Sequence, residues 1–173
     1  MLAYRLATFL CVMLLGTSAL ATEGERYLGM EVGYRPIITA ETTLHTPALT
    51  LGGGYHFSDF ALVEGTLFYG ATYANDAFQN VAAANLAFRL LIDATQWVPS
   101  IGPEIGYLAG YSTDSGLIHS FYAGGSACLE YRTWRTHSFA LCGEMAVVPF
   151  QDDFESFYGI GFRANGFLPY LFE

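Results

Sequence analysis

The sequence YLGMEVGYR at residues 27–35 alternates between two kinds of side chain. Leu28, Met30, Val32 and Tyr34 fall on one side of an extended chain, and the three positions between them are Gly, Glu and Gly. A repeat of two residues is the period of a β-strand whose two faces meet different surroundings. The pattern therefore predicts a strand, and the question is whether its apolar face meets a protein core or another environment.

The same alternation recurs in eight segments, with turn-like residues between them: 27–35, 48–57, 61–71, 81–92, 101–111, 119–131, 138–148 and 156–172. Most are close to the length that a tilted strand needs to cross a bilayer, about nine to eleven residues. Only 13% of the chain is charged, against roughly 25% in ordinary soluble domains. Pro103 and Pro169 remove ladder donors within two of these segments, so we expect bulges or strand ends there.

One face of the predicted strands carries nearly all of their charge: Glu31, Arg35, Glu64, Arg89, Glu104, Glu130, Glu144 and Arg163. Most of the glycines lie on this face too, whereas Leu, Phe and Tyr fill the other. The interior of an eight-stranded barrel is only wide enough for side chains to meet, so the small residues belong inside. The bulky apolar face then points outward to lipid. We predict an all-β fold, an eight-stranded antiparallel up-and-down transmembrane β-barrel with every backbone group paired.

Residues 1–21 are predicted to be a cleaved secretory signal peptide. Arg5 provides a positive charge, an apolar core follows over residues 6–15, and Ala19-Leu20-Ala21 fits a signal-peptidase site. The apolar core is about half of the ~20 residues that a membrane-spanning helix requires. The barrel is therefore expected to comprise residues 22–173.

The connections and the aromatic residues suggest an orientation. The outer connections, predicted at 36–47, 72–80, 112–118 and 149–155, are longer than the inner ones at 58–60, 93–98 and 132–137, as is usual for such barrels. Aromatic residues gather at both predicted rims, as interface belts do. The inner belt comprises Trp97, Trp134, Tyr170 and Phe172, with Tyr27 nearby, and the outer belt comprises Tyr34, Tyr69, Tyr111 and Tyr158.

With these features the chain resembles the small eight-stranded outer-membrane barrels of the OmpX and OmpA transmembrane-domain type. The nearest approach to a motif is the C-terminal segment GIGFRANGFLPYLFE, in which Ile160, Phe162, Leu168, Tyr170 and Phe172 share the outward parity. The resemblance implies a place in the bacterial cell outer membrane, surrounded by lipid and lipopolysaccharide. It also implies that the outer-membrane assembly machinery inserts the chain.

The charged face is expected to form a network of ion pairs that plugs the lumen, because an unpaired buried charge is very costly. The expected registers give two groups of neighbours: Arg163 with Glu31 and Glu130, and Arg89 with Glu64 or Glu104. The five lumenal glutamates outnumber the three arginines, so we expect a glutamate or His56 to hold a proton. The alternative is a narrow path that conducts ions or protons.

Cys128 and Cys142 share the lumenal parity on two successive strands. A hairpin centred near Arg135 sets them directly opposite each other, within the reach of a disulfide. An oxidising compartment favours that bond. Two small buried thiols are the alternative.

The sequence favours a non-enzymatic structural or surface-interaction role. A formal charge of −9 disfavours nucleic acid. A lipid A-modifying enzyme of the deacylase type needs a Ser activated by His on the lipid-facing surface. His56 has lumenal parity, His119 faces outward but its neighbour Ser120 does not, and His137 and Ser138 lie at an inner turn. This enzyme class is the weaker alternative, and we predict no catalytic residues, cofactor or metal site.

The predicted outer loops are acidic: Glu41, Asp76, Asp114, Asp152, Asp153 and Glu155. Hydration of the loop tips accounts for such residues. Binding of divalent cations or of an unknown surface partner remains the alternative.

Overall fold

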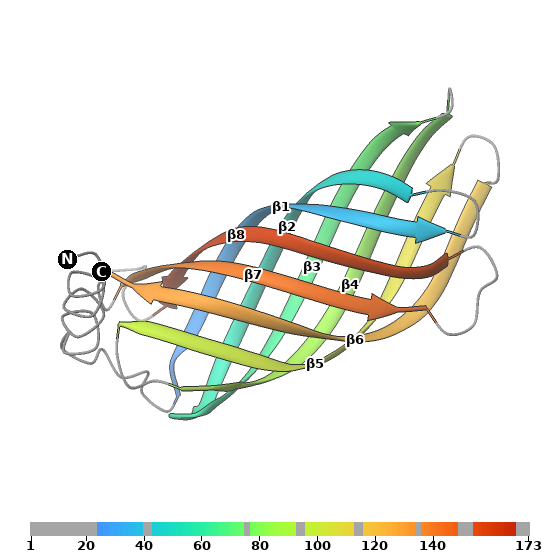
Figure 1. Cartoon of the computed structure of the whole chain (residues 1–173). Helices are drawn as coiled ribbons and strands as arrows, with labels where there is room; N and C mark the ends of the chain where they lie inside the picture. Colours follow the sequence, from blue (N-terminus) through green and yellow to red (C-terminus); the bar gives the residue numbers. More distant parts are fainter. Residues whose placement is uncertain are drawn as a thin grey trace, which may run out of the picture.

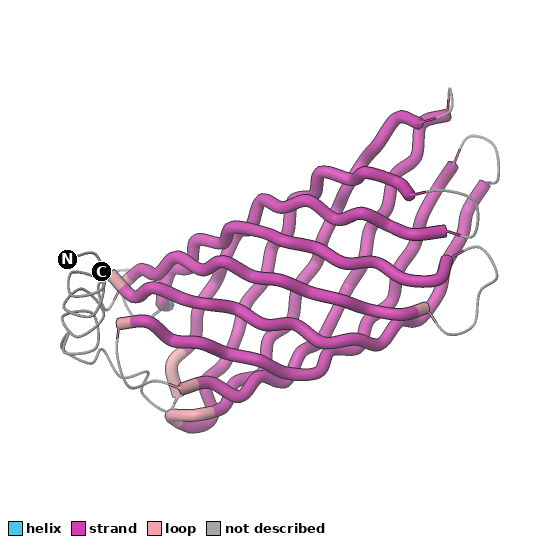
Figure 2. Tube along the Cα trace, viewed as in Figure 1, coloured by secondary structure: helices cyan, strands magenta, loops and turns pink. Residues whose placement is uncertain are grey.

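The computed structural model describes residues 24–39, 43–74, 77–92, 96–112, 116–133, 136–148 and 154–168. These residues form eight strands and the ends of their connections (Figure 1, Figure 2). The strands are β1 (Arg26–Thr39), β2 (Thr43–Ser58), β3 (Ala61–Ala74), β4 (Ala77–Leu91), β5 (Trp97–Ser112), β6 (Gly116–Arg132), β7 (His137–Val147) and β8 (Phe154–Phe167). The predicted signal peptide lies outside the described residues.

Each strand pairs antiparallel with its neighbour in the sequence, and β1 pairs with β8 to close the barrel. Closure leaves no sheet edge, so the backbone donors and acceptors of the wall pair within the sheet. The predicted fold is confirmed. Among the described residues, no helix is long and apolar enough to cross a bilayer.

At one end of the barrel most strands start and end close to the predicted positions, but β5 already begins at Trp97 and β8 already ends at Phe167, so the predicted limits 101 and 172 are wrong. At the other end most strands extend further than predicted. We call the first end, where β2–β3, β4–β5 and β6–β7 connect, the turn end, and the opposite end the loop end. The predicted outer connection 36–47 is wrong, because β1 runs to Thr39 and β2 begins at Thr43. The apolar side chains of Ile37 and Leu44 are buried inside the barrel, which stabilises this extension of the sheet.

The predicted difference in length between outer and inner connections is also wrong. At the loop end, residues 40–42 separate β1 from β2, and residues 75–76 separate β3 from β4. At the turn end, the longer stretch 92–96 separates β4 from β5. The length of the connections therefore does not orient this barrel. The predicted bulge or strand end at Pro103 is wrong as well, since β5 continues through it without a register shift. Its pairing with β4 is nevertheless interrupted at Pro103 and Gly102, between the pairs Ala87–Glu104 and Leu90–Ile101, because Pro103 has no N–H to donate to the ladder.

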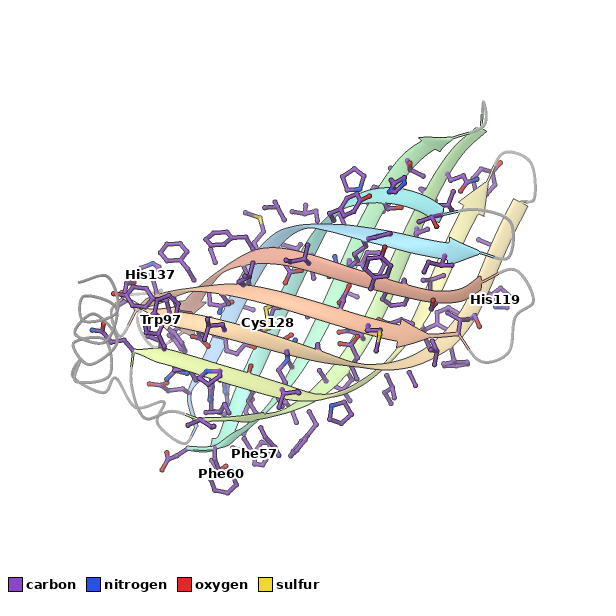
Figure 3. The ribbon with its side chains drawn as sticks, viewed as in Figure 1. Phe57, Phe60, Trp97, His119, Cys128 and His137 are labelled. Carbon is purple, nitrogen blue, oxygen red and sulfur yellow. A yellow bond between two sulfur atoms is a disulfide. The ribbon has the colours of Figure 1, made fainter. Side chains whose placement is uncertain are left out.

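Side chains alternate between the outside and the lumen along every strand, as Figure 3 shows. Large apolar residues are exposed outside, for example Leu117 and Phe121 with 70% and 69% of their surface accessible. The lumenal glycines make room for large side chains within. A Cβ on Gly54 would collide with the ring of Tyr27, and one on Gly106 with the ring of Tyr122. On the outward glycine Gly65, by contrast, a Cβ would meet nothing nearer than 3.9 Å.

Candidate functional site: the filled lumen

The lumen is filled in three layers along the barrel. At the loop end an apolar cluster includes Ile37, Phe68, Leu108, Tyr122 and Phe157. At the turn end a second cluster comprises Tyr27, Leu62, Leu91, Val98 and Phe167. The charged residues lie between these clusters, with one further pair near the turn end. Sequence reasoning found the charged layer but not the two apolar ones, because their side chains share the parity of the glycines and charges.

The middle layer centres on Arg163 of β8 and Glu64 of β3. Arg163 Nη1 lies 2.5 Å from Glu64 Oε2, and its Nη2 lies 2.9 Å from Glu31 Oε2. Arg89 of β4 reaches Glu64 Oε1 at 3.1 Å. The hydroxyl of Tyr27 also donates to Glu64. Glu64 therefore accepts hydrogen bonds from three side chains, which is how a buried carboxylate offsets its lost hydration.

Arg35 of β1 joins a second pair of carboxylates. Its guanidinium donates to Glu144 of β7 and, at 3.1 Å, to Glu31 of the same strand. A third bond runs to the hydroxyl of Thr50 at 2.8 Å. The guanidinium carbon also lies 4.7 Å from the centre of the Phe68 ring, within cation–π range. Arg35 thus connects the charged layer to the apolar cluster at the loop end.

The expected groupings are confirmed for Arg163 with Glu31 and for Arg89 with Glu64, but Arg163 does not pair with Glu130. Glu130 instead accepts from Arg132 Nε at 3.2 Å. Arg132 was assigned to an inner connection, whereas it ends β6 with its side chain buried in the lumen and 5.6 Å from the Phe167 ring centre. The signal for it was present, since its even number continues the lumenal parity of Cys128 and Glu130.

Glu104 of β5 is the exception in this network. Its side chain is buried, yet among the described residues it forms no ion pair, and its Oε1 has no hydrogen-bond partner. The pairs Glu104–Gly124 and Gly124–Ala146 place small residues beside it along the wall. With Arg132 included, five lumenal glutamates face four arginines, and Glu104 is the carboxylate left over.

A disulfide joins Cys128 and Cys142, as predicted. The two residues are directly opposite in the β6–β7 register, and both side chains face the lumen. The guanidinium of Arg89 contacts the sulfur of Cys128, so the bond is packed against the charged layer. Figure 3 places Cys128 in the wall well away from both rims.

Solved structures of other barrels match this arrangement of strands. Neisserial surface protein A aligns with a TM-score of 0.74 at 9% identity, over 83% of this chain and 99% of that one. Ail, the attachment invasion locus protein of Yersinia pestis, aligns with a TM-score of 0.58 at 11% identity, over 84% and 99%. The outer membrane protein OprG from Pseudomonas aeruginosa aligns with a TM-score of 0.57 at 13% identity, over 84% and 98%. No family model matches the sequence, and a search of the curated proteins finds no match.

The fold is that of the small outer-membrane barrels. At identities this low, the likeness concerns the number, order and closure of the strands and not the residues that line them. The described residues also contain no group of three His, Cys, Asp or Glu side chains that could hold a metal ion.

The aromatic residues of the two rims largely lie where the sequence placed them. Tyr34, Tyr69, Tyr111 and Tyr158 are exposed on the outer face toward the loop end. Trp97 lies at the turn end with its ring centre 4.7 Å from that of Tyr131 (Figure 3). The prediction that Tyr27 lies near the inner belt is wrong. Its side chain faces the lumen, where its hydroxyl donates to Glu64. Trp134, Tyr170 and Phe172 lie outside the described residues.

The residues weighed for catalysis do not come together on the lipid-facing surface. His56, Ser120 and Ser138 are buried in the lumen, whereas His119 and His137 are exposed near opposite ends (Figure 3). Of the acidic residues assigned to the outer loops, Glu155 lies within β8. Glu41, Asp76, Asp114, Asp152 and Asp153 lie outside the described residues.

Proposed function

We propose that this protein spans the outer membrane of a bacterial cell as a sealed, non-enzymatic barrel with a structural or surface-interaction role. The observation that carries the proposal is the filling of the lumen in three layers. A water path along the axis would have to pass two apolar clusters as well as the ion pairs between them. The exposed belt of Leu, Ile, Phe and Tyr supports lipid as the surrounding solvent.

The charged layer has a structural role in this proposal. Bonds from β8 to β3 and from β1 to β7 tie together strands that are not neighbours in the wall. Such bonds brace the barrel across its interior, where a change in diameter would break them. A narrow channel is the alternative to a sealed barrel. It would require the side chains of both apolar clusters to move apart and leave a path for water.

A lipid A-modifying activity is the less favoured alternative. The serines Ser120 and Ser138 face the lumen, and acyl chains lie on the other side of the wall. We therefore infer no catalytic role for the histidines His119 and His137.

A surface partner remains part of the proposal. Ail has been solved in complex with the heparin analogue sucrose octasulfate. A polyanion of that kind does not suit this chain, which has 16 acidic and 7 basic residues. A divalent cation that bridges lipopolysaccharide, or a basic protein segment, fits the acidic residues predicted in the outer loops better.

The class is tested by fractionating cells that express the full chain and comparing heated with unheated samples on a gel. We expect the protein in the outer-membrane fraction, with a band that shifts on heating. Planar-bilayer recordings with the purified protein, run beside an open porin, test the seal. We expect no conductance steps. Recovery of the protein as a folded, soluble species without detergent would overturn the proposal, and steady conductance would replace the sealed barrel by a channel.

A further inference from the structure

The outer face carries a hollow in its belt of bulky side chains over β5 to β8, larger than a second apolar hollow over β3 to β5. Ala127 of β6 and Gly143 of β7 stand directly opposite each other, and both point outward. Ile101 of β5 flanks Ala127 on one side, and Ile160 of β8 flanks Gly143 on the other. This row of large, small, small and large residues across four strands forms the floor and walls of an apolar groove of about 660 Å³.

Packing within the protein does not explain the missing side chain at Gly143. A Cβ there would meet only a backbone oxygen at 3.8 Å, which is ordinary contact. The backbone does not have the positive φ that favours glycine, and the β6–β7 register shows no bulge. Glycine inside a strand weakens it, and such a residue often marks close approach by a ligand or another backbone. The lumenal glycines differ, since side chains such as Tyr27 beside Gly54 occupy their space. The outward Gly65 is as open as Gly143, but it does not line this groove.

The groove runs toward the turn end. The pair Leu129–Leu141 borders the hollow on that side, and the lining continues to residues 90–92 at the end of β4 and to Pro99 near the start of β5. Trp97 and Tyr131 lie at the same rim, where interfacial aromatic residues mark the level of lipid headgroups. The groove therefore begins near one membrane interface and extends into the hydrocarbon region.

We propose that this groove binds one acyl chain of a membrane lipid in the leaflet at the turn end. The inference rests on the proposed membrane location. The lining is almost wholly apolar, which suits an occupant without polar groups, and the bilayer presents acyl chains to this face. The volume falls within the roughly 300–1,000 Å³ of ordinary ligand pockets. A second barrel fits less well, because Ile101, Ile160, Leu129 and Leu141 stand out around the floor and hold a broad partner away from it.

The test uses the purified full-length barrel in vesicles that contain phosphatidylethanolamine with a photoreactive diazirine in the acyl chain. Cross-linked peptides are mapped by mass spectrometry. We expect labelling to concentrate on residues 127–129 and 141–143. In Ala127→Leu, which fills the floor, labelling of both segments should fall several-fold.

The matched control is Ala84→Leu on β4, another exposed outward alanine that lies outside the groove. It should leave labelling of the groove unchanged. Labelling spread evenly over the outer face, or equal in both variants, would overturn the inference. Cross-links between two barrels through these residues would overturn it in favour of a dimer. Failure to enter vesicles would instead count against the proposed function, so heat-modifiable migration of each variant is recorded first.

Discussion

Arg163 and Glu64 are bonded across the interior of the barrel, with 2.5 Å between Nη1 and Oε2, although β1 and β2 separate their strands in the wall. The same guanidinium also bonds Glu31 on β1. One cation therefore holds three strands at a fixed spacing. Both carboxylates are buried, so each would lose one of its two cationic partners in the interior if Arg163 were removed.

Replacing Arg163 with Met should lower the free energy of unfolding by about 3–5 kcal/mol, the usual cost of breaking a buried ion pair. Met retains most of the side-chain volume but leaves Glu31 and Glu64 with one cation fewer. Urea titration in detergent micelles, followed by tryptophan fluorescence, measures the change. Arg26→Met at the exposed turn end is the control and should change the value by less than about 0.5 kcal/mol. Equal losses in both variants would contradict a bracing role for Arg163.

Glu104→Gln should have the opposite effect and raise the free energy of unfolding by about 1–3 kcal/mol. Gln has the same shape as Glu but carries no charge. It therefore avoids the cost of burying a carboxylate whose Oε1 has no hydrogen-bond partner. Glu31→Gln, at a carboxylate bonded to Arg35 and Arg163, should lower the stability. The same urea titration compares the two variants. A loss in both would mean that Glu104 is held by a partner as Glu31 is.

Removing the disulfide by the double substitution Cys128→Ala and Cys142→Ala should cost about 2–4 kcal/mol, since the bond closes a short loop with a separation of 14 residues. In the purified barrel both sulfurs should resist thiol labelling under non-reducing conditions, even after unfolding. Reductant should release them readily only from the unfolded chain, because both side chains are buried. Labelling of the unfolded, non-reduced protein at these two residues would show free thiols.

Substitution of a lumenal glycine should be far more costly than that of an outward one. Gly106→Ala places a methyl group against the ring of Tyr122 and should destabilise the barrel by about 1–3 kcal/mol, as overpacking does. Gly65→Ala faces outward with open space and should be neutral or slightly stabilising. The fraction of folded band on unheated gels across a urea series gives both values. Equal sensitivity would contradict the assignment of the two faces.

The sequence was sufficient to predict the fold because alternation of period two carries both the position of each strand and the direction of its faces. The same parity, together with the centre of the β6–β7 hairpin, brought Cys128 opposite Cys142. Parity also put Glu31 and Arg163 on the lumenal face, where closure of β1 against β8 pairs them. Local sequence patterns therefore predicted contacts between strands that are neighbours in the wall.

Contacts across the lumen were harder to predict. The bond between Arg163 and Glu64 depends on how the barrel is tilted and closed, which no single hairpin specifies. The inward direction of Tyr27 was missed because an aromatic residue near a rim also suits the interface belt. The strand extension at Ile37 was missed because turn-like residues nearby suggested a loop.

Glu31 and Arg163 also meet directly at the seam between β1 and β8. β1 thus carries a carboxylate that shares its charge with Arg35 of its own strand and with Arg163 of β8. Until β8 pairs with β1, Glu31 has Arg35 but lacks Arg163, the second of its two cations. The pair makes the arrival of β8 a condition for sealing the cylinder, so a variant that lacks β8 should stall during biogenesis and be cleared instead of accumulating in the envelope.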